Sequence, residues 1–169
     1  SGQDLDTPEA ERLLNETYES FVRNGAALEG EDRARLTALN EELSTLSLTF
    51  GEHVLAETKA FQYHTAATQD LQGLPEDVIE TAAQQGQEQG KEGYVLGLDM
   101  PTYMAVMKYA DRSELRAHFY CAYGSRAAKE NENNNEQVIK HLVNKRMERA
   151  QLLGFDSHAQ LTLSKRMAK

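Results

Sequence analysis

A stripe of large apolar residues without a helix breaker places the strongest constraint on the fold of this chain. The residues recur three and four positions apart and no proline lies between positions 31 and 59; the stripe is Leu36, Leu39, Leu43, Leu46 and Phe50. Such spacing keeps side chains on one face of an α-helix. We therefore predict a helix over residues 31–59, about 43 Å long at 1.5 Å per residue. Leu48 and Leu55 lie off the stripe, which predicts packing on two sides of this helix.

Prolines and glycines mark where the first helices begin and end. Proline is tolerated in a first helical turn, so Thr7-Pro8-Glu9 predicts a capped helix over roughly residues 8–24. Gly73-Leu74-Pro75 predicts a second helix start with acidic residues in its first turn. Three glycines are predicted to end that helix: Gly86, Gly90 and Gly93.

The remainder of the chain from Pro101 is predicted to be helical. Asp111 with Glu114, and Ser157 with Gln160, have the spacing of capping boxes that start two of these helices. Between them, apolar residues at helical spacing over residues 138–150 predict a helix that stops at Gly154.

Two short segments alternate with period two and predict β-strands: Phe61, Tyr63 and Thr65, then Tyr94, Leu96 and Leu98. The predicted fold class is mainly α, a helical bundle-like array with a long central helix and a small two-stranded β element. We treat residues 1–169 as one helical region. It consists of two helices in 1–60, a strand-helix-strand insert in 61–99 and a helical segment in 100–169.

Charge and apolar content exclude several partners. The chain has 27 acidic and 18 basic residues, a net charge of −9, which argues against nucleic-acid binding because phosphates need clustered Lys and Arg. No apolar run approaches the ~20 residues that cross a bilayer, so we expect no membrane insertion. Cys121 is the only cysteine and cannot form an internal disulfide.

Residues with reactive side chains do not form a recognisable catalytic pattern. The five histidines (53, 64, 118, 141 and 158) do not form an H-E-x-x-H motif. His53 and Glu57 lie one helical turn apart, which we interpret as a polar end of a buried seam rather than a metal pair. His118 is interpreted as a hydrogen-bonded core histidine and Cys121 as a buried small hydrophobe. His64 alternates on a strand and could face a cleft. We predict no catalytic or metal-binding residue.

Three further groups have a structural and a functional interpretation. Met100, Met104 and Met107 suit core filling better than a docking surface, and the Asn-rich turn 131–135 suits a solvated loop. Tyr120, Tyr123 and Arg126 could line a groove for a peptide, although helix-packing tyrosines and a surface arginine explain them more simply. Substrate-binding residues therefore remain unknown.

Six segments are informative through their order along the chain: Asn40 to Lys59, Gly73 to Pro75, Lys91 to Tyr103, Arg112 to Arg126, Ala150 to Phe155 and His158 to Ala168. Taken together in this order, they resemble the thimet oligopeptidase, oligopeptidase A and peptidyl-dipeptidase family of zinc metallopeptidases. The resemblance implies a mostly helical enzyme with a deep channel that admits short peptides. In this family the H-E-x-x-H zinc motif lies well C-terminal to the matched region, so no catalytic or metal residue is carried over.

From this resemblance we expect an N-terminal-half fragment of a peptidase that forms part of the wall of the substrate channel. The chain begins without Met and ends within helical periodicity, as an excised piece would. The full-length enzyme would hold zinc and cleave short peptides in the cytoplasm. The fragment itself would bind no zinc and be inactive, with the catalytic half as its packing partner. Endopeptidase and peptidyl-dipeptidase activities are not separated. The alternative is a stand-alone acidic helical module for protein-protein interaction.

Overall fold

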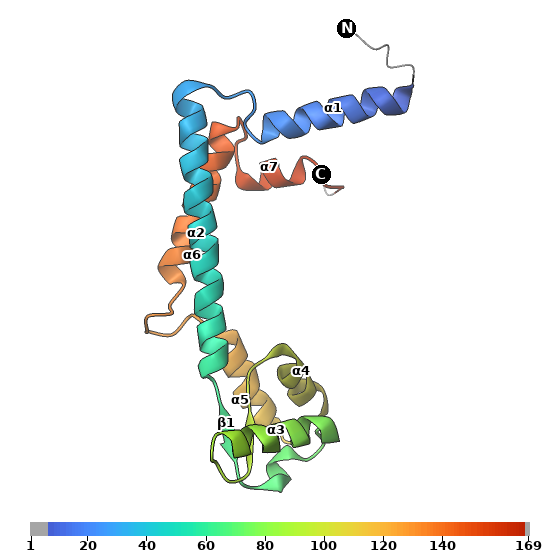
Figure 1. Ribbon diagram of the computed structural model, residues 1–169, viewed down its shortest axis with the longest axis vertical. Helices are drawn as coiled ribbons and strands as arrows, with labels where there is room; N and C mark the ends of the chain where they lie inside the picture. Colours follow the sequence, from blue (N-terminus) through green and yellow to red (C-terminus); the bar gives the residue numbers. More distant parts are fainter. Residues whose placement is uncertain (1–6, 168–169) are drawn as a thin grey trace. The chain divides into compact units, whose positions relative to one another are not determined.

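The computed structural model describes residues 7–167 and shows a mainly α-helical chain (Figure 1). Within these residues it contains seven α-helices, one 3-10 helix and one two-stranded sheet, which confirms the predicted fold class. In chain order the elements are α1 (Pro8–Arg23), α2 (Gly30–Ala60), β1 (Tyr63–Thr65), η1 (Thr68–Leu71), α3 (Glu76–Glu88), β2 (Tyr94–Leu96), α4 (Met100–Tyr109), α5 (Ser113–Gly124), α6 (Glu136–Leu152) and α7 (His158–Leu163).

The chain divides into two compact units. Unit 1 contains the chain up to Leu48 together with the chain from Val138 onward, and unit 2 contains Thr49–Gln137. The division into segments 1–60, 61–99 and 100–169 stays a prediction. Within residues 7–167, no helix combines the length and the apolar character that crossing a membrane requires.

The long helix α2 extends one residue beyond its predicted bounds at each end. Leu36 and Leu39 are buried, as the stripe predicts, at 5% and 0% exposure. The predicted packing on two sides is wrong, because Leu48 and Leu55 are 63% and 51% exposed. Periodicity identifies an apolar position on a helix, but the described chain supplies no neighbour that covers these two.

Unit 1 is held by ion pairs and a few buried residues. The unit 1 parts of α2 and α6 lie side by side (Figure 1), with Arg35 paired to Glu148 and Lys145 Nζ 2.7 Å from Glu42 Oε2. Helix α7 begins where predicted, since Ser157 Oγ accepts the Gln160 N–H at 3.1 Å. In a capping box the Gln160 side chain would accept from the Ser157 N–H. Here Gln160 Oε1 accepts from the N–H of the preceding residue, Asp156.

Unit 2 is built around a cluster of buried apolar residues from η1, α3, β2, α4 and α5. Phe119 of this cluster is fully buried, with its ring 5.2 Å from that of Phe61 in an edge-to-face arrangement. The buried cluster consists of Leu71, Leu74, Ala82, Leu96, Leu98, Val106, Ala110, Leu115 and Phe119. Unit 2 therefore has a hydrophobic core of its own.

The predicted strands pair antiparallel, with Tyr63 opposite Leu96 and Thr65 opposite Tyr94. The prediction that Gly86 ends the preceding helix is wrong, because α3 continues to Glu88. Gly86 is buried, and a Cβ there would collide with the carbonyl oxygen of Gly93. Its small size lets α3 approach the loop before β2, whereas Gly90, with φ +65°, lies in the turn after the helix.

Asp111 does not cap α5, contrary to prediction. The N-cap position is Arg112, which makes no capping bond through its side chain. Arg112 instead pairs with Asp70, and the Asp111 N–H donates to the Gln72 carbonyl at 2.9 Å. The segment before α5 is thus fixed by contacts with the chain around η1, which overrides the local capping signal.

Candidate functional site

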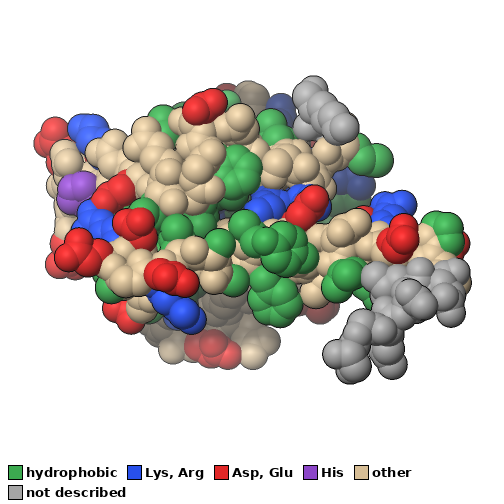
Figure 2. Space-filling model, turned by 90° about the horizontal axis from the view of Figure 1, so that it is seen from above, with side chains coloured by type: hydrophobic (Ala, Val, Ile, Leu, Met, Phe, Trp, Pro, Cys, Tyr) green, Lys and Arg blue, Asp and Glu red, His purple; other side chains and the backbone are tan. Residues whose placement is uncertain are grey.

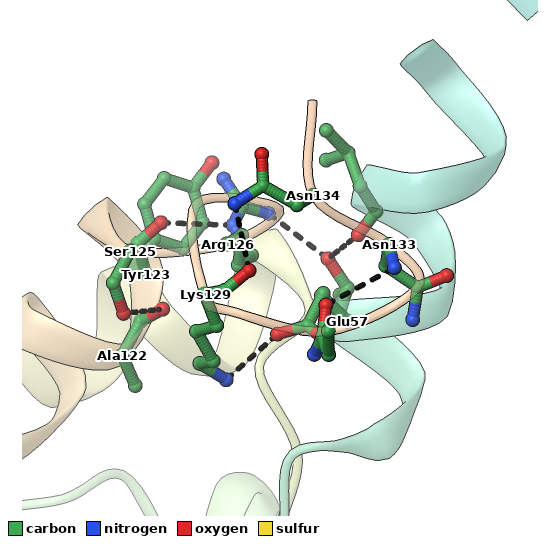
Figure 3. A network of polar contacts seen from close by, with 11 residues as sticks. Glu57, Ala122, Tyr123, Ser125, Arg126, Lys129, Asn133 and Asn134 are labelled. Atoms are coloured by element: carbon green, nitrogen blue, oxygen red, sulfur yellow. Dashed lines mark hydrogen bonds and ion pairs between the residues drawn. The ribbon is translucent and has the colours of Figure 1, made fainter. Parts of the chain in front are cut away.

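A buried carboxylate organises a polar network in unit 2, drawn in Figure 3. Glu57, on the last turn of α2, is only 5% exposed. Its Oε2 lies 2.7 Å from Lys129 Nζ, and its Oε1 accepts from Asn131 Nδ2 at 2.7 Å. These two contacts, of which the Lys129 hydrogen bond is the stronger cause, lower the pKa of Glu57 against the opposing effect of burial. Glu57 therefore ties α2 to the loop between α5 and α6.

His53 makes a second connection to the same loop, one helical turn before Glu57. Its Nδ1 lies 2.9 Å from Asn135 Oδ1, while Asn135 Nδ2 donates to the Phe50 carbonyl at 3.1 Å. Because the amide nitrogen is occupied by that carbonyl, Oδ1 is the acceptor and His53 Nδ1 carries the proton. Asn135 is 2% exposed, so the interpretation of the Asn-rich turn as a solvated loop is wrong at this position.

Arg126 joins this network to a pair of stacked tyrosines. The Tyr103 and Tyr123 rings are 4.0 Å apart and nearly parallel, and the Arg126 guanidinium lies 3.4 Å from the Tyr123 ring centre. Arg126 Nε also donates to the Tyr123 carbonyl at 2.9 Å and Nη1 to Thr58 Oγ1 at 3.1 Å. Tyr120 takes no part in these contacts and is 64% exposed. Packing thus accounts for Tyr123 and Arg126, which do not join Tyr120 in a groove.

Two residues expected in the core lie at the surface. His118 is exposed, with its ring 5.5 Å from Phe61 and 5.7 Å from Tyr63. Cys121 is also exposed. Both expectations of burial are wrong, because α5 buries only the narrow face that carries Leu115 and Phe119.

Met100, Met104 and His64 also lie at the surface. Met100 and Met104 are 54% and 53% exposed, so core filling is the wrong interpretation of these two. The Met100 sulfur accepts a weak hydrogen bond from the Tyr123 hydroxyl at 3.8 Å. His64 is exposed on β1 and its Nε2 lies 2.8 Å from the Glu92 carbonyl, a contact that connects β1 to the loop before β2.

The side chains that could act as metal ligands are dispersed in the described part of the chain. Among residues 7–167, no three His, Cys, Asp or Glu side chains come together in a group that could hold a metal ion. His53 and Glu57 share a helical face, yet each is engaged by an asparagine or lysine from the α5–α6 loop. His53 and Glu57 therefore both have hydrogen-bonding partners within unit 2.

Comparison with known proteins finds similarity to peptidases. The model of peptidase family M3 matches residues 106–169. Oligopeptidase A of Haemophilus influenzae is 30% identical over 162 residues, which cover 94% of this chain and 24% of that protein. Dipeptidyl carboxypeptidase of Escherichia coli is 32% identical over 163 residues, covering 95% of this chain and 24% of that protein. This chain is similar to the peptidases of family M3. The resemblance seen in the sequence is confirmed.

The similarity to M3 peptidases extends over both compact units but over little of the relatives. The chain spans about a quarter of the length of the curated relatives it matches.

Sequence reasoning missed the partners of Glu57, namely Lys129 and Asn131, and it missed the buried role of Asn135. The sequence carried no signal that distinguishes these residues, because asparagine is also common in solvated turns.

Proposed function

We propose that this chain forms a non-catalytic helical portion of a zinc metallopeptidase that hydrolyses short peptides, and that it forms part of the wall of the substrate channel. The observation that carries the proposal is the 94% coverage of the chain by an alignment with an oligopeptidase, which includes most of both units. Relatives named as oligopeptidase and as dipeptidyl carboxypeptidase support both activities equally.

In this proposal, zinc and the residues that activate water belong to another part of the polypeptide. Zinc-dependent hydrolysis needs three protein ligands and a general base in one small volume, and the described residues do not supply them. A channel wall needs only a rigid surface that limits the size of the substrate. Exposed apolar residues on α1 support packing against the catalytic half; they are Leu13, Leu14, Tyr18 and Phe21. We also propose a cytoplasmic location.

The first test uses the 169-residue chain. We expect metal analysis to find no stoichiometric zinc, and a quenched fluorescent pentapeptide to remain uncleaved, while an intact oligopeptidase A serves as positive control. One zinc per chain together with peptide cleavage would contradict the proposal that these residues are non-catalytic.

The second test uses the gene and its whole product. We expect the reading frame to continue past Lys169 and to encode H-E-x-x-H, whereas a stop codon there would favour the interaction module. Hydrogen exchange of the whole product with a slowly cleaved peptide should show protection within residues 7–167. Protection confined to other regions would refute the role as channel wall.

A further inference from the structure

A basic cavity of about 570 Å³ lies in unit 1, bounded by α1, α6 and α7. Arg23 of α1, Arg149 of α6 and His158 of α7 line it. Arg149 and His158 also line a second cavity of about 530 Å³, to which α6 adds Arg146 and α2 adds polar residues. Two guanidinium groups and one imidazole from three helices therefore meet around one volume.

These side chains hold buried hydrogen-bonding atoms without partners. Among the described residues, Arg23 Nε, Arg149 Nε and His158 Nδ1 are buried and make no hydrogen bond. Arg23 is held in place by a bond from Nη2 to the Leu161 carbonyl. Buried polar atoms without partners are uncommon in folded proteins, because each one loses its hydration without compensation. The three residues that carry these atoms line the same cavity, and their cationic side chains point to a ligand that can accept hydrogen bonds.

The carboxylates near this cavity are engaged with other cations. Glu16 Oε1 lies 2.8 Å from Arg12 Nε, and Glu19 forms an ion pair with Lys165. On α6, Glu148 pairs with Arg35 and with Lys145. In the described part of the chain, no carboxylate forms an ion pair with Arg23, Arg146 or Arg149. Although the whole chain carries a net charge of −9, the cavity has an excess of positive charge.

The chemistry of the donors selects the ligand. Guanidinium groups present N–H donors in a planar fork that matches the oxygens of an oxyanion, and several of them suit a divalent anion best. The cavity exceeds the size of a single inorganic ion, so an ester of the anion also fits. We infer that this cavity binds a phosphate group, either free phosphate or the phosphate of a small metabolite. This inference does not depend on the proposed peptidase function.

The imidazole of His158 provides a spectroscopic reporter. Burial, and secondarily the charges of Arg146 and Arg149, lower its pKa below the ordinary value. The other charged groups around it are Arg23, Glu16 and Lys165, all of which line the same cavity. A bound dianion would favour the protonated imidazole. Phosphate should therefore raise the pH at which the His158 ring resonances titrate, and chloride at equal ionic strength should not.

The decisive experiment is a titration of the 169-residue chain with inorganic phosphate, followed by NMR and calorimetry. Arg149→Gln should weaken binding about tenfold or more, the effect of one charge-assisted hydrogen bond. The matched control is Arg33→Gln, an exposed arginine of α2 in the same unit, which should change affinity by less than about twofold because its charge is screened. If circular dichroism shows that Arg149→Gln has lost helix, Arg149→Lys replaces it and should also weaken binding.

Three ligands distinguish the sources of the anion. Tighter binding of adenosine monophosphate than of phosphate would identify a metabolite site, and equal binding would identify a site for free phosphate. Tighter binding of succinate than of either would overturn the assignment to phosphate. No saturable binding of phosphate by the folded chain, or equal weakening by Arg33→Gln and Arg149→Gln, would overturn the site itself.

Discussion

Phe119 in unit 2 and Phe21 in unit 1 both lie on amphipathic helices, yet the first is fully buried and the second is 63% exposed. Helix α5 packs into the apolar cluster of unit 2, whereas α1 has no buried residue although its apolar residues recur at helical spacing. Figure 2, a view from above, shows other hydrophobic side chains at the surface among charged ones. The same sequence pattern therefore gives a core in one unit and an uncovered face in the other.

Unit 1 depends more on polar contacts. Its buried apolar side chains are few: Leu36, Leu39, Leu142, Ala150 and Leu161. Ion pairs between α2 and α6 are partly exposed and contribute little individually, since exposed pairs stabilise by about 0–1 kcal/mol. We therefore expect unit 2 to be the more stable of the two.

The largest expected effect tests this difference directly. Phe119→Ala should destabilise unit 2 by about 3–5 kcal/mol, because it removes a buried aromatic ring and leaves a cavity. The control Phe21→Ala should cost less than about 0.5 kcal/mol, as for exposed positions. Urea unfolding followed by hydrogen exchange of each unit measures both. Equal losses for the two variants would show that α1 is buried in solution and that the two units do not differ in this respect.

A second pair of variants compares glycines with positive φ. Gly93 (φ +95°) and Gly25 (φ +89°) both disfavour a side chain. A Cβ at Gly93 meets the backbone of Thr65, while one at Gly25 meets the flexible side chain of Leu36. Gly93→Ala should therefore cost about 2–4 kcal/mol and Gly25→Ala about 1–2 kcal/mol. Thermal unfolding measures the difference, and a larger loss for Gly25→Ala would mean that unit 1 is the more tightly packed.

Much of this architecture is predictable from the sequence, because helices and strands follow from periodicity. The sequence predicted the bounds of α2 to within one residue, the two paired strands and the cap at Ser157. Exposure is harder to predict: Leu48, His118 and Cys121 lie on helices, and periodicity does not tell which helical faces have neighbours. The sequence could not predict the network around Glu57, because its partner Lys129 is distant in sequence and lies on an irregular loop.

The ion pair between the buried Glu57 and the half-exposed Lys129 should respond to substitution and to pH. Glu57→Gln should cost about 1–3 kcal/mol at neutral pH, because Lys129 and Asn131 lose a charged acceptor. The folded-state pKa of Glu57 is lowered, so its contribution is fully present above the unfolded value of about 4.3 and is lost as pH falls through the folded value.

The matched control in unit 1 is Glu42→Gln, which removes an exposed partner of Lys145 and should leave stability almost unchanged. Urea unfolding across a pH series measures both variants. The difference between the parent chain and Glu57→Gln should be constant from neutral to mildly acidic pH and then shrink. A difference that grows on acidification would contradict the assignment of an ionised Glu57.

The smallest effect compares two helix caps of the same geometry. Ser157 Oγ caps α7 in unit 1 by accepting the Gln160 N–H at 3.1 Å. Asp99 Oδ1 caps α4 in unit 2 by accepting the Thr102 N–H at 3.0 Å. Replacement of either by Ala should cost about 1 kcal/mol. Helix α4 buries Ala105 and Val106 in or beside the core, so the loss from Asp99→Ala should appear throughout unit 2.

Helix α7 buries only Leu161, so faster hydrogen exchange after Ser157→Ala should be confined to residues 158–163. If exchange accelerated across all of unit 1 instead, this unit would unfold as cooperatively as unit 2. The two units would then differ in how much apolar surface they bury but not in cooperativity. The uncovered apolar face of α1 would be the remaining difference between them.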